Sequence, residues 1–269
     1  YKDSPNRQTR DSVLITDLVN SNFSTRQDIV LGIGKDNSFI LGTYKNYSQA
    51  NKDTQLLLVE IETSLNIINK VPVNIYEAVN PNNINGVSIL SLEIASTKRV
   101  FITGIYVENN QVRGFVASIL KDGTIDWIKK IKPYKGVNNF VRITGSVVDA
   151  TSGFLYIVGD YSGFYKFDNF DLPDFEILPS GPIQAKFIAK LDTLGNVVWV
   201  FGTAPATVRL SGFSRYAANF DSSNNVYFTG VFNGDFIVGQ DTNRSFTNRD
   251  QFLAKVSDLS LRRDTNLAE

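Results

Sequence analysis

Acidic and aromatic side chains are mixed most densely between residues 163 and 176. Closely spaced carboxylates suit a hard cation, so Asp168, Asp171 and Asp174 are candidate calcium ligands, although their spacing is not that of an EF-hand. The aromatic residues among them also fit contact with a carbohydrate or protein partner. A third interpretation is an ordinary solvated hairpin that covers the edge of a sheet. The segment alone leaves these three interpretations open.

The chain lacks two residue types on which many enzymes depend, because it contains neither cysteine nor histidine. This composition excludes disulfides, thiolate nucleophiles, cysteine-ligated zinc and the Ser-His-Asp triad. Any catalysis would have to use other groups, such as the paired carboxylates of glycosidases.

Acids are rare on the strands that we expect to lie innermost in the fold. Asp28 and Glu93 are the only two, they stand at opposite strand ends, and they form no repeated pair. Arg142 and Arg215 stand on two other such strands, where each could bind an anion or pair with a nearby carboxylate. We therefore predict that the chain is not an enzyme.

Composition also limits the partners. The chain carries 27 basic and 27 acidic side chains, whereas a general nucleic-acid binder needs a basic excess. Its apolar runs are too short to span a bilayer. The sequence opens Tyr1-Lys2-Asp3, which fits a removed signal peptide as well as a trimmed boundary. We expect no nucleic acid and no membrane insertion, and we predict an extracellular or surface-exposed protein, with a virion surface as the alternative.

A repeat organises the chain. Apolar segments that end in glycine recur at Gly42, Gly104, Gly159 and Gly230, with spacings of 62, 55 and 71 residues. Short runs of β-branched and aromatic residues, bounded by Asn, Asp and Gly, are typical of strands joined by tight turns. A sustained helical stripe is essentially absent. We predict an all-β chain whose units are four-stranded antiparallel sheets, and such modules pack radially as the blades of a β-propeller.

Two stretches carry a family resemblance. Residues Phe187–Val200 read FIAKLDTLGNVVWV, and residues Asp221–Gly230 read DSSNNVYFTG. This combination resembles the SBBP-type β-propeller repeat, and the likeness extends loosely over residues 28–258. The resemblance implies a β-propeller fold and little about activity, because such repeats occur mostly in uncharacterised secreted or surface proteins.

Counting strands predicts how the ring closes. Within a single domain, 1–269, the blade repeats are expected at 28–73, 86–131, 143–202 and 215–258. The last repeat supplies three good strands, and residues 12–18 form one unassigned strand. We predict four blades of four strands, in which residues 12–18 complete the last blade and close the ring. A five-bladed ring or an open arc is the alternative.

Antiparallel order decides which loops share a face. Turns from first to second and from third to fourth strands are short and lie at one end, whereas second-to-third loops and blade connections are long and lie at the other. Loops longer than a connection needs often carry function. The binding residues predicted on this long-loop face are Tyr47, Tyr134, Phe164, Tyr165, Asp168, Phe170, Asp171, Arg209, Asp235 and Phe236.

Trp127 and Trp199 occupy the same position in two repeats. They could form an aromatic platform for sugars, but we favour wedges between neighbouring blades, which bury a large aromatic area. The repeat glycines are likewise interpreted as bulge or close-packing positions and not as phosphate-binding ones.

These features predict a non-catalytic β-propeller that acts as a binding or adhesion module and recognises a glycan or protein partner through its long-loop face. The alternative is a structural component of an extracellular fibre, matrix or virion, for which self-assembly is possible. A third hypothesis is a carboxylate-based glycan-active enzyme. No cofactor is expected, with calcium as the one exception considered above.

Overall fold

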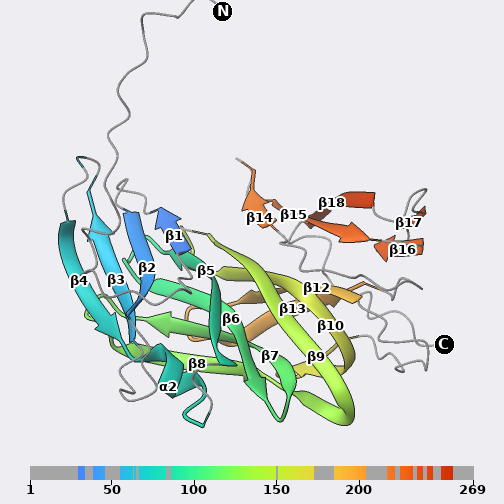
Figure 1. Ribbon diagram of the computed structural model, residues 1–269. Coiled ribbons are helices and arrows are strands. Elements are labelled where there is room, and N and C mark those ends of the chain that lie inside the picture. Colours follow the sequence, from blue (N-terminus) through green and yellow to red (C-terminus); the bar gives the residue numbers. More distant parts are fainter. Residues whose placement is uncertain are drawn as a thin grey trace, which may run out of the picture.

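The computed structural model describes a defined part of the chain. It comprises residues 30–33, 39–45, 55–62, 64, 67–82, 86–149, 151–172, 185–203, 217–221, 225–232, 235–238, 241–244 and 250–256. Four antiparallel sheets follow one another along the chain, and they are arranged side by side in a curved row (Figure 1). The predicted all-β fold is confirmed, and we call the sheets blades 1 to 4.

The strands of each blade follow chain order from the innermost strand outward. Blade 1 consists of β1 (Val30–Ile33), β2 (Phe39–Lys45), β3 (Gln55–Ile61) and β4 (Ile67–Val73). Blade 2 consists of β5 (Ser88–Ile94), β6 (Val100–Glu108), β7 (Gln111–Ile119) and β8 (Ile125–Ile131). Blade 3 consists of β9 (Pro133–Val148), β10 (Leu155–Phe167), β12 (Ala185–Leu191) and β13 (Val197–Gly202), with the short β11 (Phe170–Asp171) beside β10.

Blade 4 has three strands in the described part of the chain. They are β14 (Ala217–Phe220), β15 (Val226–Phe232) and β18 (Asp250–Val256). Between β15 and β18, the strands β16 (Asp235–Val238) and β17 (Asp241–Arg244) form a separate hairpin. Residues 12–18 lie outside the described residues, so the proposed closing strand stays a prediction.

Three apolar cores hold successive blades together. Leu58 of blade 1 packs in one cluster with Ile102 and Phe115 of blade 2, and Phe101 and Val116 of blade 2 pack with Phe187 of blade 3. Tyr156 and Ile188 of blade 3 pack with blade 4 in the third cluster. The innermost strands touch in the order β1, β5, β9 and β14. Face-to-face sheets around a row of first strands are the arrangement of a β-propeller.

Trp127 wedges blade 2 against blade 3. Its indole Nε1 donates a hydrogen bond to the carbonyl oxygen of Thr193 over 3.0 Å. Gly195 of the same turn adopts φ +82°, and a Cβ atom there would lie 2.9 Å from the Trp127 ring. Trp199 stands edge-on to Tyr156 in the next core, with ring centroids 5.9 Å apart. The prediction that both tryptophans are inter-blade wedges is confirmed.

Two of the repeat glycines are close-packing positions, as predicted. A Cβ atom on Gly104 would lie 2.1 Å from the carbonyl oxygen of Ser88, and one on Gly159 would lie 1.9 Å from that of Arg142. In blades 2 and 3 the second strand therefore approaches the first more closely at this position than a side chain would allow. The pairing register also shifts beside Gly159, which marks a β-bulge.

Some predicted loops are more regular than their sequences indicate. Residues Glu108–Val112 are not a long loop, because Asn109 and Asn110 adopt φ 52° and 60° and close the β6–β7 hairpin directly. Between blades 2 and 3, where a long connection was expected, the chain passes almost directly from β8 into the long strand β9. Helix is not wholly absent, since the connection after β4 contains α2 (Ile75–Val79) with Ile75 and Tyr76 buried. No described helix is long and apolar enough to cross a membrane.

Candidate active site

At one equivalent position of the innermost strands, blade 2 carries a different kind of residue from the other three blades. The penultimate residues of β1, β5, β9 and β14 are Gly32, Glu93, Val147 and Asn219. A Cβ atom on Gly32 would touch Leu92 and Ile94 of the next first strand, and Val147 packs in the core that contains Phe220 of β14. This position therefore faces the following first strand, and blade 2 places a carboxylic acid there.

Hydroxyl groups and a backbone amide surround Glu93. The Ser91 hydroxyl donates to Oε1 of Glu93 over 3.4 Å, and the Ser146 hydroxyl of β9 donates to the Ser91 hydroxyl over 2.7 Å. The side chain is half-buried between β5 and β9. Burial raises the pKa of Glu93 to about 7, although hydrogen bonds from Ser91, the backbone of Val148 and Ser146 act in the opposite direction.

A carboxyl group with this pKa exists in both protonation states near neutral pH. It can give a proton to a bound group or accept one from it, which is the requirement for general acid–base catalysis. The sequence identified Glu93 as one of two inner acids but did not include it among the site residues. A comparison of the repeats could have identified Glu93, because the equivalent positions of the other three innermost strands carry no acid. The other inner acid, Asp28, lies outside the described residues.

A second buried carboxylate is neutralised by neighbouring cations. Asp160 is fully buried on β10 and pairs across the sheet with Arg142 on β9 and Lys186 on β12. The Arg142 guanidinium donates from Nε to Oδ1 of Asp160 over 3.1 Å and also binds Oδ2. Burial lowers the pKa of Lys186 to about 8, while Asp160 acts in the opposite direction. Arg142 therefore pairs with a local carboxylate, the second of the two roles considered from its sequence. Arg215 lies outside the described residues.

Tyr165 is not available to a partner. Its side chain is fully buried between blades 2 and 3, and Nη1 of Arg113 donates a hydrogen bond to its hydroxyl over 3.0 Å. The predicted binding role of Tyr165 is therefore wrong. The cause is the length of β10, which continues through Phe167 where a loop was expected and turns this ring into the core.

The acids proposed for calcium bind lysines in the described part of the segment. The Lys129 ammonium lies 2.6 Å from each carboxylate oxygen of Asp168, and Asp168 also accepts the backbone N–H of Val197 over 3.0 Å. Asp171 pairs with Lys166 over 2.8 Å. Among the described residues, three or more acids do not converge on any point that could hold a metal. Asp174 lies outside this part of the chain.

Two of the predicted aromatic residues meet on the surface. Tyr134 on β9 is 45% exposed and lies edge-on to Phe164 on β10, with ring centroids 6.2 Å apart. The Lys135 and Lys166 ammonium groups lie over these rings, at 4.5 Å from the centroid of Phe164 and 4.9 Å from that of Tyr134. One ammonium group thus lies over each ring, and Tyr134 remains 45% exposed.

The remaining predicted binding residues lie elsewhere in the described part of the chain or outside it. Phe170 packs against the core between blades 2 and 3. Asp235 and Phe236 lie on β16, where the structure describes the backbone alone. Tyr47 and Arg209 lie outside the described residues. Among the described side chains, the structure therefore brings together Tyr134 and Phe164, and Asp171 joins them through its ion pair with Lys166.

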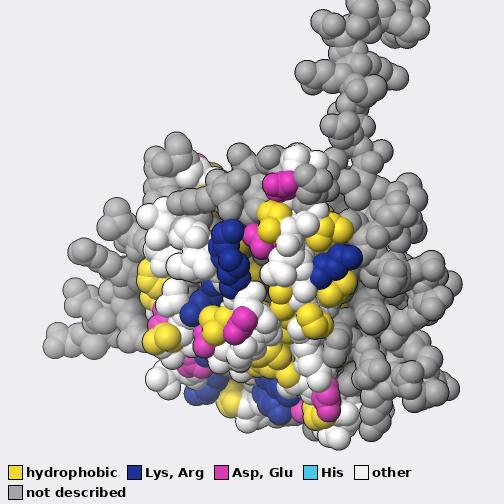
Figure 2. Space-filling view, turned by 90° about the vertical axis from the view of Figure 1, so that its left-hand side faces the viewer, with side chains coloured by type: hydrophobic (Ala, Val, Ile, Leu, Met, Phe, Trp, Pro, Cys, Tyr) yellow, Lys and Arg dark blue, Asp and Glu magenta, His cyan; other side chains and the backbone are white. Residues whose placement is uncertain are grey.

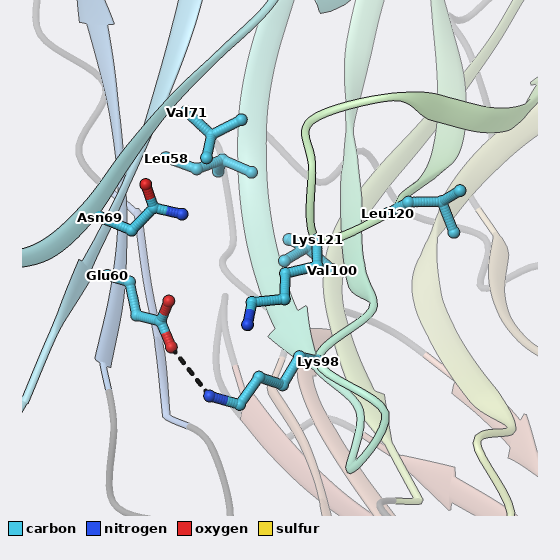
Figure 3. A pocket seen from close by; sticks show the side chains of 8 residues that line it. All are labelled: Leu58, Glu60, Asn69, Val71, Lys98, Val100, Leu120 and Lys121. Atoms are coloured by element: carbon cyan, nitrogen blue, oxygen red, sulfur yellow. Dashed lines mark hydrogen bonds and ion pairs between the residues drawn. The ribbon is translucent and has the colours of Figure 1, made fainter.

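A small cavity lies between blades 1 and 2 (Figure 3). Its lining includes Glu60 and Lys98, whose ion pair spans 3.1 Å, and the apolar residues Leu58, Val71 and Val100. Its volume of about 30 Å³ is enough for ordered water and far too small for a sugar ring. Figure 2 shows, on the side of blade 1, lysine and arginine side chains in separate small groups and not in a continuous basic surface.

Neither a protein-family model nor a curated protein sequence matches the chain. Several solved structures match at low similarity. A levansucrase from B. megaterium has 12% identity and a TM-score of 0.44, over 85% of this chain and 66% of the levansucrase. A levansucrase from B. subtilis has 12% identity and a TM-score of 0.43, over 85% and 67%. The polysaccharide lyase Uly1 has 12% identity and a TM-score of 0.44, over 85% of this chain and 48% of the lyase.

These matches contradict the prediction of a non-catalytic binding, adhesion or virion module, because the proteins that they name are enzymes. We therefore withdraw that prediction and the expectation that the chain is not an enzyme. Similarity at 12% identity and a TM-score of 0.44 assigns no activity to this chain. Any assignment of catalysis must rest on the chain's own residues.

Proposed function

We propose that the chain is a glycan-active enzyme that uses a carboxyl group as its proton donor, and that Glu93 is this group. The observation that carries the proposal is a half-buried acid on an innermost strand with a pKa of about 7. Glycosidic bonds break readily only when the leaving oxygen receives a proton, and a carboxylic acid with a raised pKa supplies that proton near neutral pH.

The chemistry assigned to Glu93 is one proton transfer. Its protonated carboxyl gives the proton to the glycosidic oxygen as the bond from that oxygen to the anomeric carbon breaks. Water then supplies a hydroxyl to the carbon and a proton that restores the acid. Ser91 and Ser146 are positioning residues in this scheme, because their linked hydroxyls fix the orientation of the carboxyl group.

A glycan panel tests the proposal. The purified chain is incubated with neutral and acidic polysaccharides, and new reducing ends are measured between pH 5 and 9. We expect activity that falls as pH rises through about 7, because Glu93 loses its proton there. Glu93→Gln, which cannot donate that proton, should lower kcat by a factor of about 100 or more.

Glu77→Gln is the matched control, since Glu77 is an exposed glutamate on α2. It should leave the rate unchanged. Equal rates for Glu93→Gln and the unaltered protein, or no bond cleavage on any polysaccharide, would overturn the assignment. The extracellular or surface location stays a prediction, and a glycan substrate is consistent with it.

A further inference from the structure

The strands β9 and β10 of blade 3 continue together beyond the strand that follows them in the sheet. β12 pairs with β10 from Leu155 to Tyr161, whereas β9 pairs with β10 as far as Tyr165. The two strands have 16 and 13 residues and lie side by side (Figure 1). The first strands described in the other blades have 4 or 7 residues. Blade 3 therefore carries an additional two-stranded ribbon at the end where its first strand begins.

Tyr134 is the extra residue of a β-bulge in this ribbon. Phe164 pairs with Lys135, and the next residue of β10 pairs with Pro133. Tyr134 is thus inserted between two paired positions of β9. Such a bulge re-aims a side chain relative to the regular alternation of the strand. Here it accompanies a large aromatic side chain that is 45% exposed, whereas Tyr165 on the neighbouring strand is fully buried.

The Tyr134 ring is held in place by its neighbours. It lies edge-on to Phe164, with ring centroids 6.2 Å apart, and the Lys166 ammonium group lies 4.9 Å from its centroid. The Lys135 ammonium group lies 4.5 Å from the centroid of Phe164. Contacts of these kinds favour one orientation of a ring. A ligand that stacks on Tyr134 would therefore lose little binding free energy to the ordering of this side chain.

Exposed groups of both charges lie beside this ring. Lys166 pairs with Asp171 over 2.8 Å, and their side chains are 44% and 65% exposed. Asp168, between them in the sequence, pairs with Lys129. In the described part of the ribbon neither charge is therefore in large excess. Such a surface offers donors and acceptors to hydroxyl groups, whereas an anionic ligand is best attracted by a surplus of cations.

We propose that this ribbon binds a neutral glycan chain, with one sugar ring stacked on Tyr134 and its hydroxyl groups bound by Lys166 and Asp171. The inference rests on the proposed function, in which the protein acts on a glycan, and it adds a second contact for the same substrate. A sugar ring has an apolar C–H face that packs on an aromatic ring, and a rim of hydroxyl groups that donate and accept hydrogen bonds. The surface around Tyr134 is suited to both.

The ribbon and Glu93 lie towards opposite ends of β9. Tyr134 is the second residue of this strand. Ser146, whose hydroxyl is linked to Glu93 through Ser91, lies near the other end. At about 3.3 Å per residue, Tyr134 and Ser146 are about 35–40 Å apart along the strand. A polysaccharide is long enough to reach both positions, whereas a trisaccharide is not, so the ribbon should favour long substrates.

Binding is measured with the Glu93→Gln protein, which leaves the ribbon intact and should not consume the ligand. Native gels that contain neutral glucans, mannans, galactans, xylans or fructans at graded concentrations give a Kd for each, and pectate is the acidic probe. We expect retardation by at least one neutral polysaccharide. Adding Tyr134→Ala should raise that Kd about tenfold, because the stacking ring is lost.

Two further variants control this measurement. Tyr134→Phe keeps the aromatic ring and should change the Kd by less than about twofold. Leu194→Ala changes another exposed apolar side chain of blade 3 and should leave the Kd unchanged.

Turnover by the protein with Glu93 intact gives a second readout. Tyr134→Ala should raise KM for a long polysaccharide at least about fivefold more than KM for a trisaccharide of the same sugars. A side chain that only supported the fold would alter both values alike.

Two results would overturn the inference. One is the absence of binding to every neutral polysaccharide, or binding that Tyr134→Ala does not weaken. The other is binding of pectate alone with an affinity that falls steeply with salt, because the ligand would then be anionic.

Failure of the proposed function is distinguishable from failure of this inference. Binding that depends on Tyr134, without cleavage of any glycan, would retain the ribbon as a glycan site and remove the catalytic assignment. Cleavage that depends on Glu93, without any effect of Tyr134→Ala on binding or KM, would do the reverse.

Discussion

At the scale of the residue, the fully buried Asp160 and the half-buried Glu93 show how neighbours decide what an acid can do. Asp160 lies between Arg142 and Lys186, so its charge is compensated within the sheet. Glu93 has only hydroxyl and amide donors as neighbours. Their hydrogen bonds lower its pKa by less than burial raises it, so its pKa rises to about 7. The first arrangement stabilises an ion, and the second keeps a proton available near neutral pH.

The raised pKa of Glu93 predicts how stability depends on pH. Folding raises this pKa from 4.5 to about 7, so between these values the folded protein binds more protons than the unfolded chain. The contribution of Glu93 to the free energy of unfolding is therefore full below pH 4.5 and decreases as pH rises to 7. Glu93→Gln removes this dependence and should be more stable than the unaltered protein at pH 8, by about 1–3 kcal/mol.

Urea unfolding at pH 4.5, 6 and 8 measures the difference. The increase in the free energy of unfolding caused by Glu93→Gln should nearly vanish at the lowest pH, because the glutamate and the glutamine are then both neutral in the folded protein. Glu77→Gln, at an exposed glutamate of α2, is the matched control for the loss of one carboxylate. A gain that is the same at all three pH values would mean that Glu93 is not desolvated as described.

At the scale of the element, turns and glycines determine the spacing of the strands. In the turn after β12, the Asp192 carboxylate accepts the backbone N–H groups of Leu194 and Asn196 over 2.9 and 2.8 Å. Gly195 then takes a positive φ, which lets the turn lie flat on Trp127 of the preceding blade. The short turns of one blade are thus part of the contact with the blade before it.

Gly159→Ala tests the close approach of β9 and β10. The added Cβ would lie 1.9 Å from a backbone oxygen, which cannot move without displacing strand β9. We expect the free energy of unfolding to fall by about 3 kcal/mol or more. At Gly114 the added Cβ would lie 3.0 Å from the Ile143 side chain, which can adjust. Gly114→Ala should therefore lower the free energy of unfolding by about 1 kcal/mol. Chemical denaturation measures both variants, and equal losses would contradict the close backbone approach as the cause of the larger loss.

At the scale of the whole molecule, stability comes from packing between blades more than from any one sheet. Each described core combines residues of two successive blades. Burial of apolar side chains from both sheets is the main favourable contribution. Blade 4 therefore has one face packed on blade 3 in the described part of the chain, whereas Leu253 on its other face is 72% exposed.

Equivalent substitutions in blades 3 and 4 test this view. Ile188→Ala removes a fully buried side chain from the core between these blades and should cost about 2–5 kcal/mol. Leu253→Ala changes the same register position where it is 72% exposed, and within one chain it should cost under about 0.5 kcal/mol. Both are measured by urea unfolding at a protein concentration low enough to prevent association. A large cost for Leu253→Ala under these conditions would show that the chain itself covers this face.

The sequence by itself determined the class of structure, because strand alternation, tight-turn residues and a glycine-marked repeat are local signals. It also placed the tryptophans between blades, since their repeat positions revealed a shared role. Tertiary structure alone decided which polar groups are accessible to a partner or able to transfer a proton. Tyr165 is buried and Asp168 binds Lys129 because β10 is longer than its loop-like sequence indicates. Glu93 differs from other acids only through burial against β9, and burial depends on residues more than fifty positions away in the chain.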